Sequence, residues 1–149
     1  MNKQLLQKQL EIEEDNRPYP YDDATGKTLV PGDTLRGKLT IGIGHNLTDK
    51  PLAAPIIRAL FDSDLFEVVN ALNIKLPWWT TLDDCRQRVL ADMCFNMGIG
   101  ALLGFPKMLA ACQRGDYLTA ANEMRSSDWF KQVGERGTRL AAMMETGEG

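Results

Sequence analysis

The sequence predicts an α+β protein, with a small N-terminal lobe that contains an antiparallel β-sheet and an all-helical C-terminal lobe. Between residues 19 and 44, the turn signals DDATGK, VPGD and RGK separate short β-capable runs. After Asn46 the apolar residues recur at helical spacing. With 149 residues, 44% of them hydrophobic, the chain has the size of one domain with its own core. We expect residues 1–61 to form the N-terminal lobe, 62–74 a connecting helix and 75–149 the helical lobe.

The N-terminal segment is predicted to be a short amphipathic helix over residues 1–14, because its leucines recur at near-helical spacing among polar residues. Pro18 and Pro20 end this helix, since proline lacks an amide donor and restricts the residue before it. Glu14 therefore lies at the C-terminal end, where the helix macrodipole disfavours the charge of a carboxylate.

Two strands are predicted in the segment that follows, over residues 28–30 (TLV) and 38–44 (KLTIGIG). In the second strand Gly42 and Gly44 alternate with two isoleucines. The isoleucines should face a core, and the bare glycine face should leave room for a ligand or another backbone.

The rest of the chain is predicted to be helical. Residues 52–61 and 62–74 favour two consecutive helices, the second capped by Asp62 or Ser63. Thr80 or Thr81 should cap a further helix that ends at Gly98. The remaining helices are expected at about 105–113, at 116–125, from Asp128, and at about 135–145.

Composition excludes several classes of protein. A net charge of -3 argues against a nucleic-acid binder. One histidine is too few for a histidine-rich zinc hydrolase, so no metal is expected. No phosphate loop or serine nucleophile elbow is present, and the three cysteines suit buried, reduced thiols. The N-terminus has no apolar run of signal-peptide length, and no membrane segment is expected, which predicts a soluble chain made in the cytoplasm.

Carboxylates remain as the candidate catalytic groups. Cleavage of a glycosidic bond needs one protonated acid on the leaving oxygen and one ionised carboxylate for water or for the sugar cation. Glu14 at a helix end and Asp23 in a turn could face each other across a cleft. A charge-rich turn on a solvated face is the alternative that the residues themselves leave open.

Three sequence blocks carry a resemblance to a known family. Glu14, eight residues, Asp23 and then the strand LTIGIGH resemble the Glu-x8-Asp and T-[IV]-G-x-G-H motifs of the phage-type lysozymes, the muramidases of the endolysin class. The blocks MCFNMGIGALLGFPKML (93–109) and SSDWFKQVGERGTRLAAMMETG (126–147) resemble later segments of that family, in the same order. The resemblance covers most of the chain and implies a single lysozyme-like domain over residues 1–149.

The resemblance also implies roles for individual residues. Glu14 would be the general acid. Asp23 would be the base that positions water or would stabilise the cationic transition state, and the hydroxyl of Thr40 would hold the attacking water. Inversion of the anomeric centre would require the two carboxyl groups to lie roughly 6.5–9.5 Å apart. The side chains expected to bind substrate are Phe95, Asn96, Phe105, Met108 and Arg136, although core packing is the ordinary role of such apolar residues.

The chain also departs from the family pattern. Sixteen residues separate Asp23 from Thr40 where the family usually has about five, which indicates an extra hairpin or loop at about 27–38. Asp15 stands where a glycine commonly follows the acid, and Asp92 stands where relatives often carry asparagine. We expect His45 to have a structural role, bracing the strand end by pairing with a carboxylate such as Asp62 or Asp64.

The resemblance implies an enzyme that hydrolyses the β-1,4 bond between N-acetylmuramic acid and N-acetylglucosamine in bacterial peptidoglycan and so lyses the host cell. No cofactor is expected. The expected enzyme is a monomer, made in the host cytoplasm, that reaches the cell wall after release by a holin-like partner or by delivery in a particle. Two alternatives stay open: a lytic transglycosylase that leaves anhydro-muramic ends, and a wall-binding module without activity.

Overall fold

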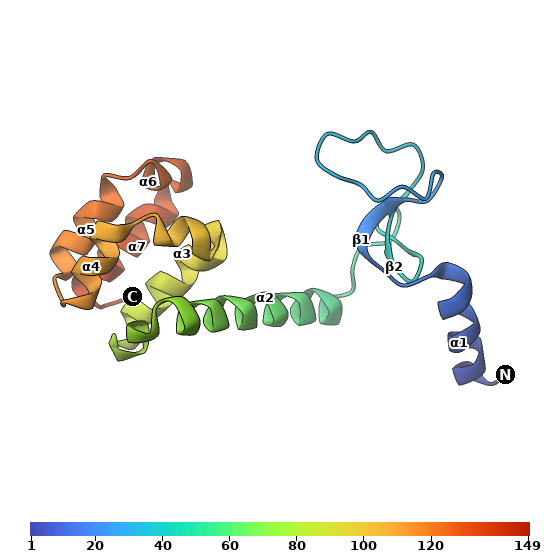
Figure 1. Ribbon diagram of the computed structural model, residues 1–149, viewed down its shortest axis with the longest axis horizontal. Helices are drawn as coiled ribbons and strands as arrows, with labels where there is room; N and C mark the ends of the chain where they lie inside the picture. The colour runs from blue at the N-terminus through green and yellow to red at the C-terminus, as the bar shows by residue number, and fades with distance from the viewer. The chain divides into compact units, whose positions relative to one another are not determined.

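The computed structural model describes all 149 residues, and they divide into two compact units, Met1–Arg58 and Ala59–Gly149. The first unit contains helix α1 and a small antiparallel sheet, and the second is entirely helical (Figure 1). The predicted α+β, lysozyme-like fold class is thereby confirmed. The division of the chain into a lobe, a connecting helix and a second lobe at residues 61 and 74 stays a prediction.

Helix α1 spans Lys3–Glu14 and ends where the sequence predicts. The side chain of Asn2 caps its N-terminus by accepting hydrogen bonds from the backbone N–H groups of Gln4 and Leu5. The helix ends at Asp15, which has φ 59° and ψ 155° and is the one non-glycine residue with a positive φ. Glycine reaches this backbone conformation freely, and other residues do so only with strain.

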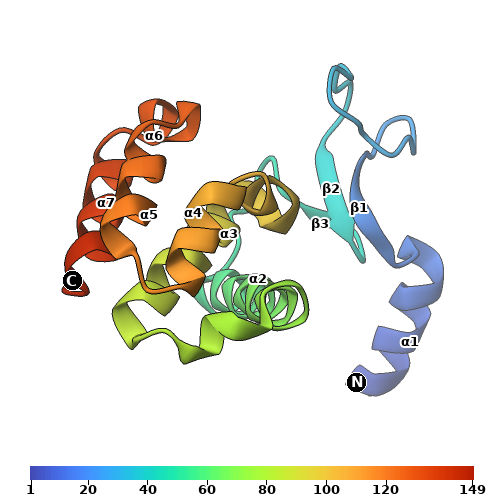
Figure 2. The same cartoon turned by 60° about the vertical axis from the view of Figure 1, so that its left-hand side comes forward.

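The sheet has three antiparallel strands in the order β1-β2-β3: β1 is Arg17–Asp22, β2 is Leu39–Gly42 and β3 is His45–Asn46 (Figure 2). The predicted strand at 28–30 is wrong, because Thr28 forms only an isolated bridge with Tyr21. Strand β1 was not predicted, because it contains two prolines. It is an edge strand with a strand on one side only, so the N–H group that proline lacks is not needed to bond a second neighbouring strand.

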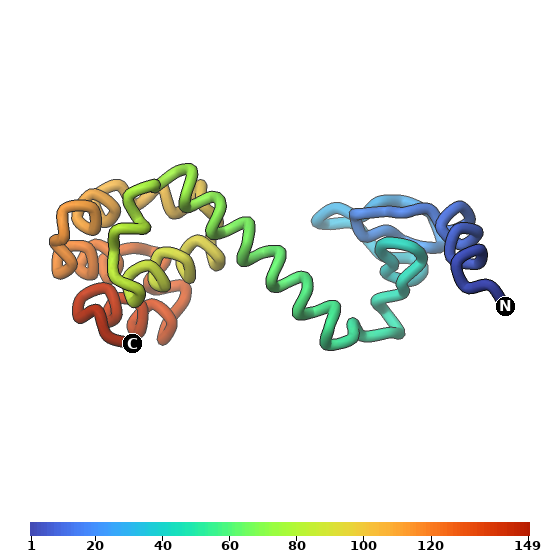
Figure 3. Tube along the Cα trace, turned by 90° about the horizontal axis from the view of Figure 1, so that it is seen from below, coloured from blue at the N-terminus to red at the C-terminus, as the bar shows by residue number.

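Residues 54–75 form one helix, α2 (Ala54–Lys75), and not the two consecutive helices predicted for this region (Figure 3). The prediction was wrong because Asp62 and Ser63 suit an N-cap but also tolerate a helix interior. No glycine or proline follows Pro55 within α2 to interrupt its hydrogen-bond ladder.

In the second unit a 3₁₀ turn, η1 (Pro77–Thr81), leads into α3 (Asp84–Leu103). Asp83 caps α3 by accepting from the N–H of Arg86, so the predicted cap at Thr80 or Thr81 is wrong. Gly98 breaks the helical conformation inside α3 with φ 82°, at the position where the sequence predicts an end. The later helices match their predictions: α4 (Pro106–Gln113), α5 (Tyr117–Arg125), α6 (Asp128–Val133) and α7 (Glu135–Thr146).

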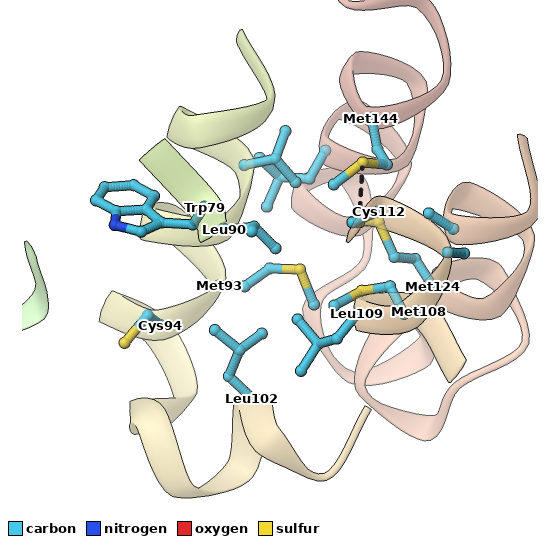
Figure 4. Packing of buried hydrophobic residues seen from close by; sticks show 14 of the residues in the cluster. Trp79, Leu90, Met93, Cys94, Leu102, Met108, Leu109, Cys112, Met124 and Met144 are labelled. Atoms are coloured by element: carbon cyan, nitrogen blue, oxygen red, sulfur yellow. Dashed lines mark hydrogen bonds between the residues drawn. The ribbon is translucent and has the colours of Figure 1, made fainter. Parts of the chain in front are cut away.

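The hydrophobic core of the second unit lies between α3, α4, α5 and α7 and is rich in sulfur-containing side chains (Figure 4). Met93, Met108 and Met144 are at most 1% exposed. Cys112 packs against Met144 with its Sγ 3.6 Å from the Met144 Sδ, and burial raises the pKa of the Cys112 thiol to about 11. All three cysteines are buried and reduced, as predicted.

No single helix of the chain is both long and apolar enough to cross a membrane. Only α3 and α4 together meet that test, and they are bent by 106°.

Candidate active site

Glu14 is positioned by the end of α1 and by a glycine on the turn after β2. The helix ends at Glu14, and its exposed side chain lies over Gly44. A Cβ atom on Gly44 would lie 2.6 Å from Glu14 Oε2 and 3.1 Å from its Cδ, closer than ordinary van der Waals contact. Glycine leaves space for the carboxylate in this position, and Gly44 also has φ +67°. The space predicted beside the glycines is therefore occupied at Gly44 by the side chain of Glu14, and it is open at Gly42.

Asp23 follows β1 and is bonded to the residue that precedes β2. Its Oδ1 accepts a 2.5 Å hydrogen bond from the backbone N–H of Lys38, and its own N–H donates to the Lys38 carbonyl at 3.1 Å. The residue is exposed, and its Oδ2 has no hydrogen-bond partner within the chain. One carboxylate oxygen is thus fixed, and the other is open to a water molecule.

Thr40 lies on β2, opposite Tyr21 of β1 in the sheet register, and is 4% exposed. Its hydroxyl donates to the carbonyl of Lys38 at 3.2 Å. Asp23 and Thr40 therefore both hydrogen-bond to the backbone of Lys38, even though sixteen residues separate them in sequence. The proton of the Thr40 hydroxyl is committed to that carbonyl, which leaves the oxygen lone pairs as its remaining bonding capacity.

The carboxylate beside Asp23 is a feature that the sequence prediction missed. Asp22 is 2% exposed and accepts three backbone hydrogen bonds, from Arg36 at 2.8 Å, from Gly37 at 2.9 Å and from Ala24 at 3.0 Å. These bonds, with that from Arg36 the strongest, lower the pKa of Asp22 despite its burial. No local sequence pattern predicts that Asp22 accepts these bonds, because two of the three donors lie fourteen and fifteen residues further along the chain.

His45 begins β3 and pairs with Ile41 in the register of the sheet. Its Nε2 atom is buried and has no hydrogen-bond partner. Asp62 and Asp64, its expected partners, belong to the other unit of the chain. The structural role of His45 stays a prediction.

Two of the residues expected to bind substrate line one pocket in the second unit. Arg136 Nε donates to Asp92 Oδ1 at 2.7 Å, and both side chains are about one-third exposed. Phe95 is 40% exposed and packs against Phe61, with ring centroids 5.8 Å apart. These four residues line a pocket of about 590 Å³ together with Leu65, Arg88, Ala91, Arg139, Leu140, Met143 and Gly149.

A second group of expected substrate contacts gathers around Trp129. Asn96 Oδ1 accepts from Trp129 Nε1 at 2.9 Å, and Phe105 packs edge-on against the same indole with centroids 6.3 Å apart. Met108 differs from the rest, since it is 1% exposed inside the core. The expectation that Met108 contacts sugar is therefore corrected: its helical spacing reflected core packing.

No cluster of three or more His, Cys, Asp or Glu side chains comes together in a way that could hold a metal ion. The first unit provides a glutamate at a helix end, and an aspartate with one open oxygen and a threonine hydroxyl that both bond to Lys38. A small sheet that precedes a long helix and a helical unit is the arrangement of a lysozyme-like α+β fold.

Comparison with known proteins agrees. The sequence profile of the family described as phage lysozyme matches residues 14–145, and the chain belongs to this family. The match begins at Glu14 itself.

Individual relatives are similar at lower coverage. The chain is 31% identical over 114 residues to probable T4-type lysozyme 1 of Dictyostelium discoideum, covering 70% of this chain and 66% of the relative. It is 28% identical over 156 residues to probable T4-type lysozyme 2 of the same organism, covering 85% and 91%. It is 30% identical over 110 residues to the pre-baseplate central spike protein Gp5 of Enterobacteria phage T4, covering 70% of this chain and only 19% of that much longer protein.

Proposed function

We propose that the protein is a muramidase, a glycoside hydrolase that cleaves the β-1,4 bond between N-acetylmuramic acid and N-acetylglucosamine in bacterial peptidoglycan. The observation that carries this proposal is the pairing of Asp23 and Thr40 at Lys38, with Glu14 held over Gly44 in the same unit. Membership of the phage lysozyme family supports the substrate class.

In the proposed mechanism Glu14 donates a proton to the leaving glycosidic oxygen. The open Oδ2 of Asp23 takes a proton from the attacking water, and the Thr40 oxygen accepts a hydrogen bond that orients this water. The charge of Asp23 also stabilises the oxocarbenium-like transition state. Phe95, Asn96, Phe105 and Arg136 are the proposed sugar contacts of the second unit. No cofactor takes part in any of these steps.

Clearing of permeabilised bacterial cells tests the proposal. The wild-type protein should lower the turbidity of the suspension, and Glu14→Gln, which keeps the shape of the side chain but cannot act as the acid, should not. The melting temperature of Glu14→Gln should equal or exceed that of the wild type. Clearing by Glu14→Gln at the wild-type rate would contradict the proposed acid, and a wild type that binds cell walls without clearing them would favour a wall-binding module.

Host lysis, synthesis in the host cytoplasm and release by a holin-like partner or a particle are further parts of the proposal. Expression inside bacteria tests them. Cells that make the protein alone should stay intact, and cells that also receive a membrane-permeabilising agent should lyse. Lysis without the agent would show that the chain needs no partner to reach the wall.

A further inference from the structure

Three consecutive backbone N–H groups are shared between two adjacent carboxylates in the first unit. The N–H groups of Arg36 and Gly37 donate to Asp22, and the next one, of Lys38, donates to Asp23. The Lys38 amide therefore orients the carboxylate of Asp23, which is proposed to act on water. The two preceding amides, of Arg36 and Gly37, are held by the adjacent carboxylate of Asp22.

Asp22 also closes both ends of the segment that the family usually lacks. At the start of this segment its Oδ1 accepts from the N–H of Ala24, and at the end the same oxygen accepts from Gly37. The backbone N–H of Asp22 also donates to the Lys27 carbonyl at 3.0 Å, and the Asp22 carbonyl accepts from the Gly26 N–H at 2.8 Å. Residues 24–37 thus form a loop whose base is fastened to one buried side chain.

Gly37 shows how closely this loop base approaches Asp23. A Cβ atom added to Gly37 would overlap Asp23 Oδ1, and it would also lie 2.6 Å from the Cβ and 2.8 Å from the backbone N of Ala24. Cβ atoms in proteins essentially never come closer than 3.0 Å to heavy atoms of residues that are not their chain neighbours. Gly37 therefore leaves no room for a side chain between the loop base, the Asp23 carboxylate and the backbone of Ala24.

We propose that Asp22 is a positioning residue of the active site: by holding the amides of Arg36 and Gly37, it fixes the Lys38 amide that orients the carboxylate of Asp23. The inference rests on the proposed function, because it assigns Asp22 an effect on the reaction of Asp23. Asp22 does not itself act on substrate, since all its side-chain oxygens are occupied by backbone donors and it is 2% exposed.

A second carboxylate of the same loop provides a matched control. Asp33 pairs with Lys27 and accepts from the N–H of Val30 at 2.9 Å, so it also holds loop backbone through an ionised side chain. It has no bond to Lys38 or Asp23. A role in loop stability alone would make the two aspartates equivalent, and a positioning role would not.

The experiment compares Asp22→Asn with Asp33→Asn in the full chain, using kcat and KM for release of reducing ends from purified peptidoglycan. The asparagine amide is isosteric but directs an NH2 group at one of the backbone donors, so one hydrogen bond is lost and two donors face each other. We expect kcat to fall about a hundredfold in Asp22→Asn, the scale of effect of a misplacement of about 1 Å, with KM little changed. Asp33→Asn should retain the wild-type kcat.

The Lys38 amide resonance in the NMR spectrum reports on the same geometry without activity. A short bond to a carboxylate shifts this proton downfield, and its position should be the same in the wild type and in Asp33→Asn. In Asp22→Asn it should move upfield. Gly37→Ala, which changes no charge and pushes directly on Asp23, should give the same loss of kcat and the same upfield movement, and it serves if Asp22→Asn does not fold.

The outcomes separate the two proposals. Equal kcat values in Asp22→Asn and Asp33→Asn, whether both unchanged or both reduced, would overturn the positioning role. If the wild type releases no reducing ends, the proposed function fails, and the Lys38 resonance alone decides whether Asp22 holds Asp23. An unchanged Lys38 resonance in a folded Asp22→Asn would overturn the inference.

Discussion

Replacing Gly44 by alanine should disable the proposed acid without changing any ionisable group. The added Cβ would lie 2.6 Å from Glu14 Oε2, and ordinary contact begins at 3.4 Å, so the carboxylate must move by about 0.8 Å (3.4 − 2.6). The atom in the way is the far end of a flexible side chain, which moves more readily than backbone. A displacement of this size lowers kcat by up to about a hundredfold, or about 2.7 kcal/mol of transition-state stabilisation.

A loss of folding stability must be distinguished from the loss of kcat, because alanine at φ +67° is strained by about 1–2 kcal/mol. Gly26 provides the control: it has φ +66°, and a Cβ there would meet nothing within 4 Å. Gly44→Ala and Gly26→Ala should lower the melting temperature by similar amounts, and only Gly44→Ala should lose kcat in an assay of reducing-end release. Equal kcat values in the two variants would refute the role of Gly44 in leaving space for the Glu14 carboxylate.

Three further predictions concern stability. Asp15→Gly should raise the melting temperature, because it relieves a backbone strain of about 1–3 kcal/mol at the end of α1; a lower value would show that the strain is compensated. Arg86→Ala should lower the free energy of unfolding in urea by about 1–3 kcal/mol, because its guanidinium bonds a carboxylate at the start of α3 and two carbonyls near the end of α7, and Arg86→Lys should recover only part of this loss. Acid should weaken the fold, because three aspartates have a lowered pKa: backbone N–H groups lower that of Asp22, and lysine partners lower those of Asp33 and Asp49. The stability that these ionised carboxylates confer is present above their ordinary pKa of 3.8 and is lost as the pH falls through the lowered pKa values. A free energy of unfolding that stays constant from neutral pH to well below 3.8 would contradict this third prediction.

The features that local sequence determines were predictable. Two prolines and the spacing of leucines placed the end of α1 at Glu14, and the helices of the second unit followed from apolar periodicity and their caps. The same local rules produced the errors. Proline-rich β1 became a strand because its partner β2 supplies the hydrogen bonds, and α2 continued through residues that resemble a cap.

The features that depend on distant residues were not predictable. The role of Asp22 requires donors from Arg36 and Gly37, and nothing in the pattern of residues 22–37 pairs them. The helical pattern likewise did not distinguish Phe95, which is 40% exposed in a pocket, from Met108, which is 1% exposed in the core. Faces of helices within a small lobe are decided by packing against all neighbours at once.

The proposed reaction is hydrolysis of peptidoglycan by a water molecule that Asp23 activates, while Glu14 protonates the leaving oxygen. Mass spectrometry of purified peptidoglycan digested in heavy-oxygen water is the sharpest test of this mechanism. We predict fragments with reducing muramic-acid ends, each carrying one heavy oxygen from the solvent, and none of these from Glu14→Gln. Anhydro-muramic ends without solvent oxygen would contradict the account and would identify a lytic transglycosylase.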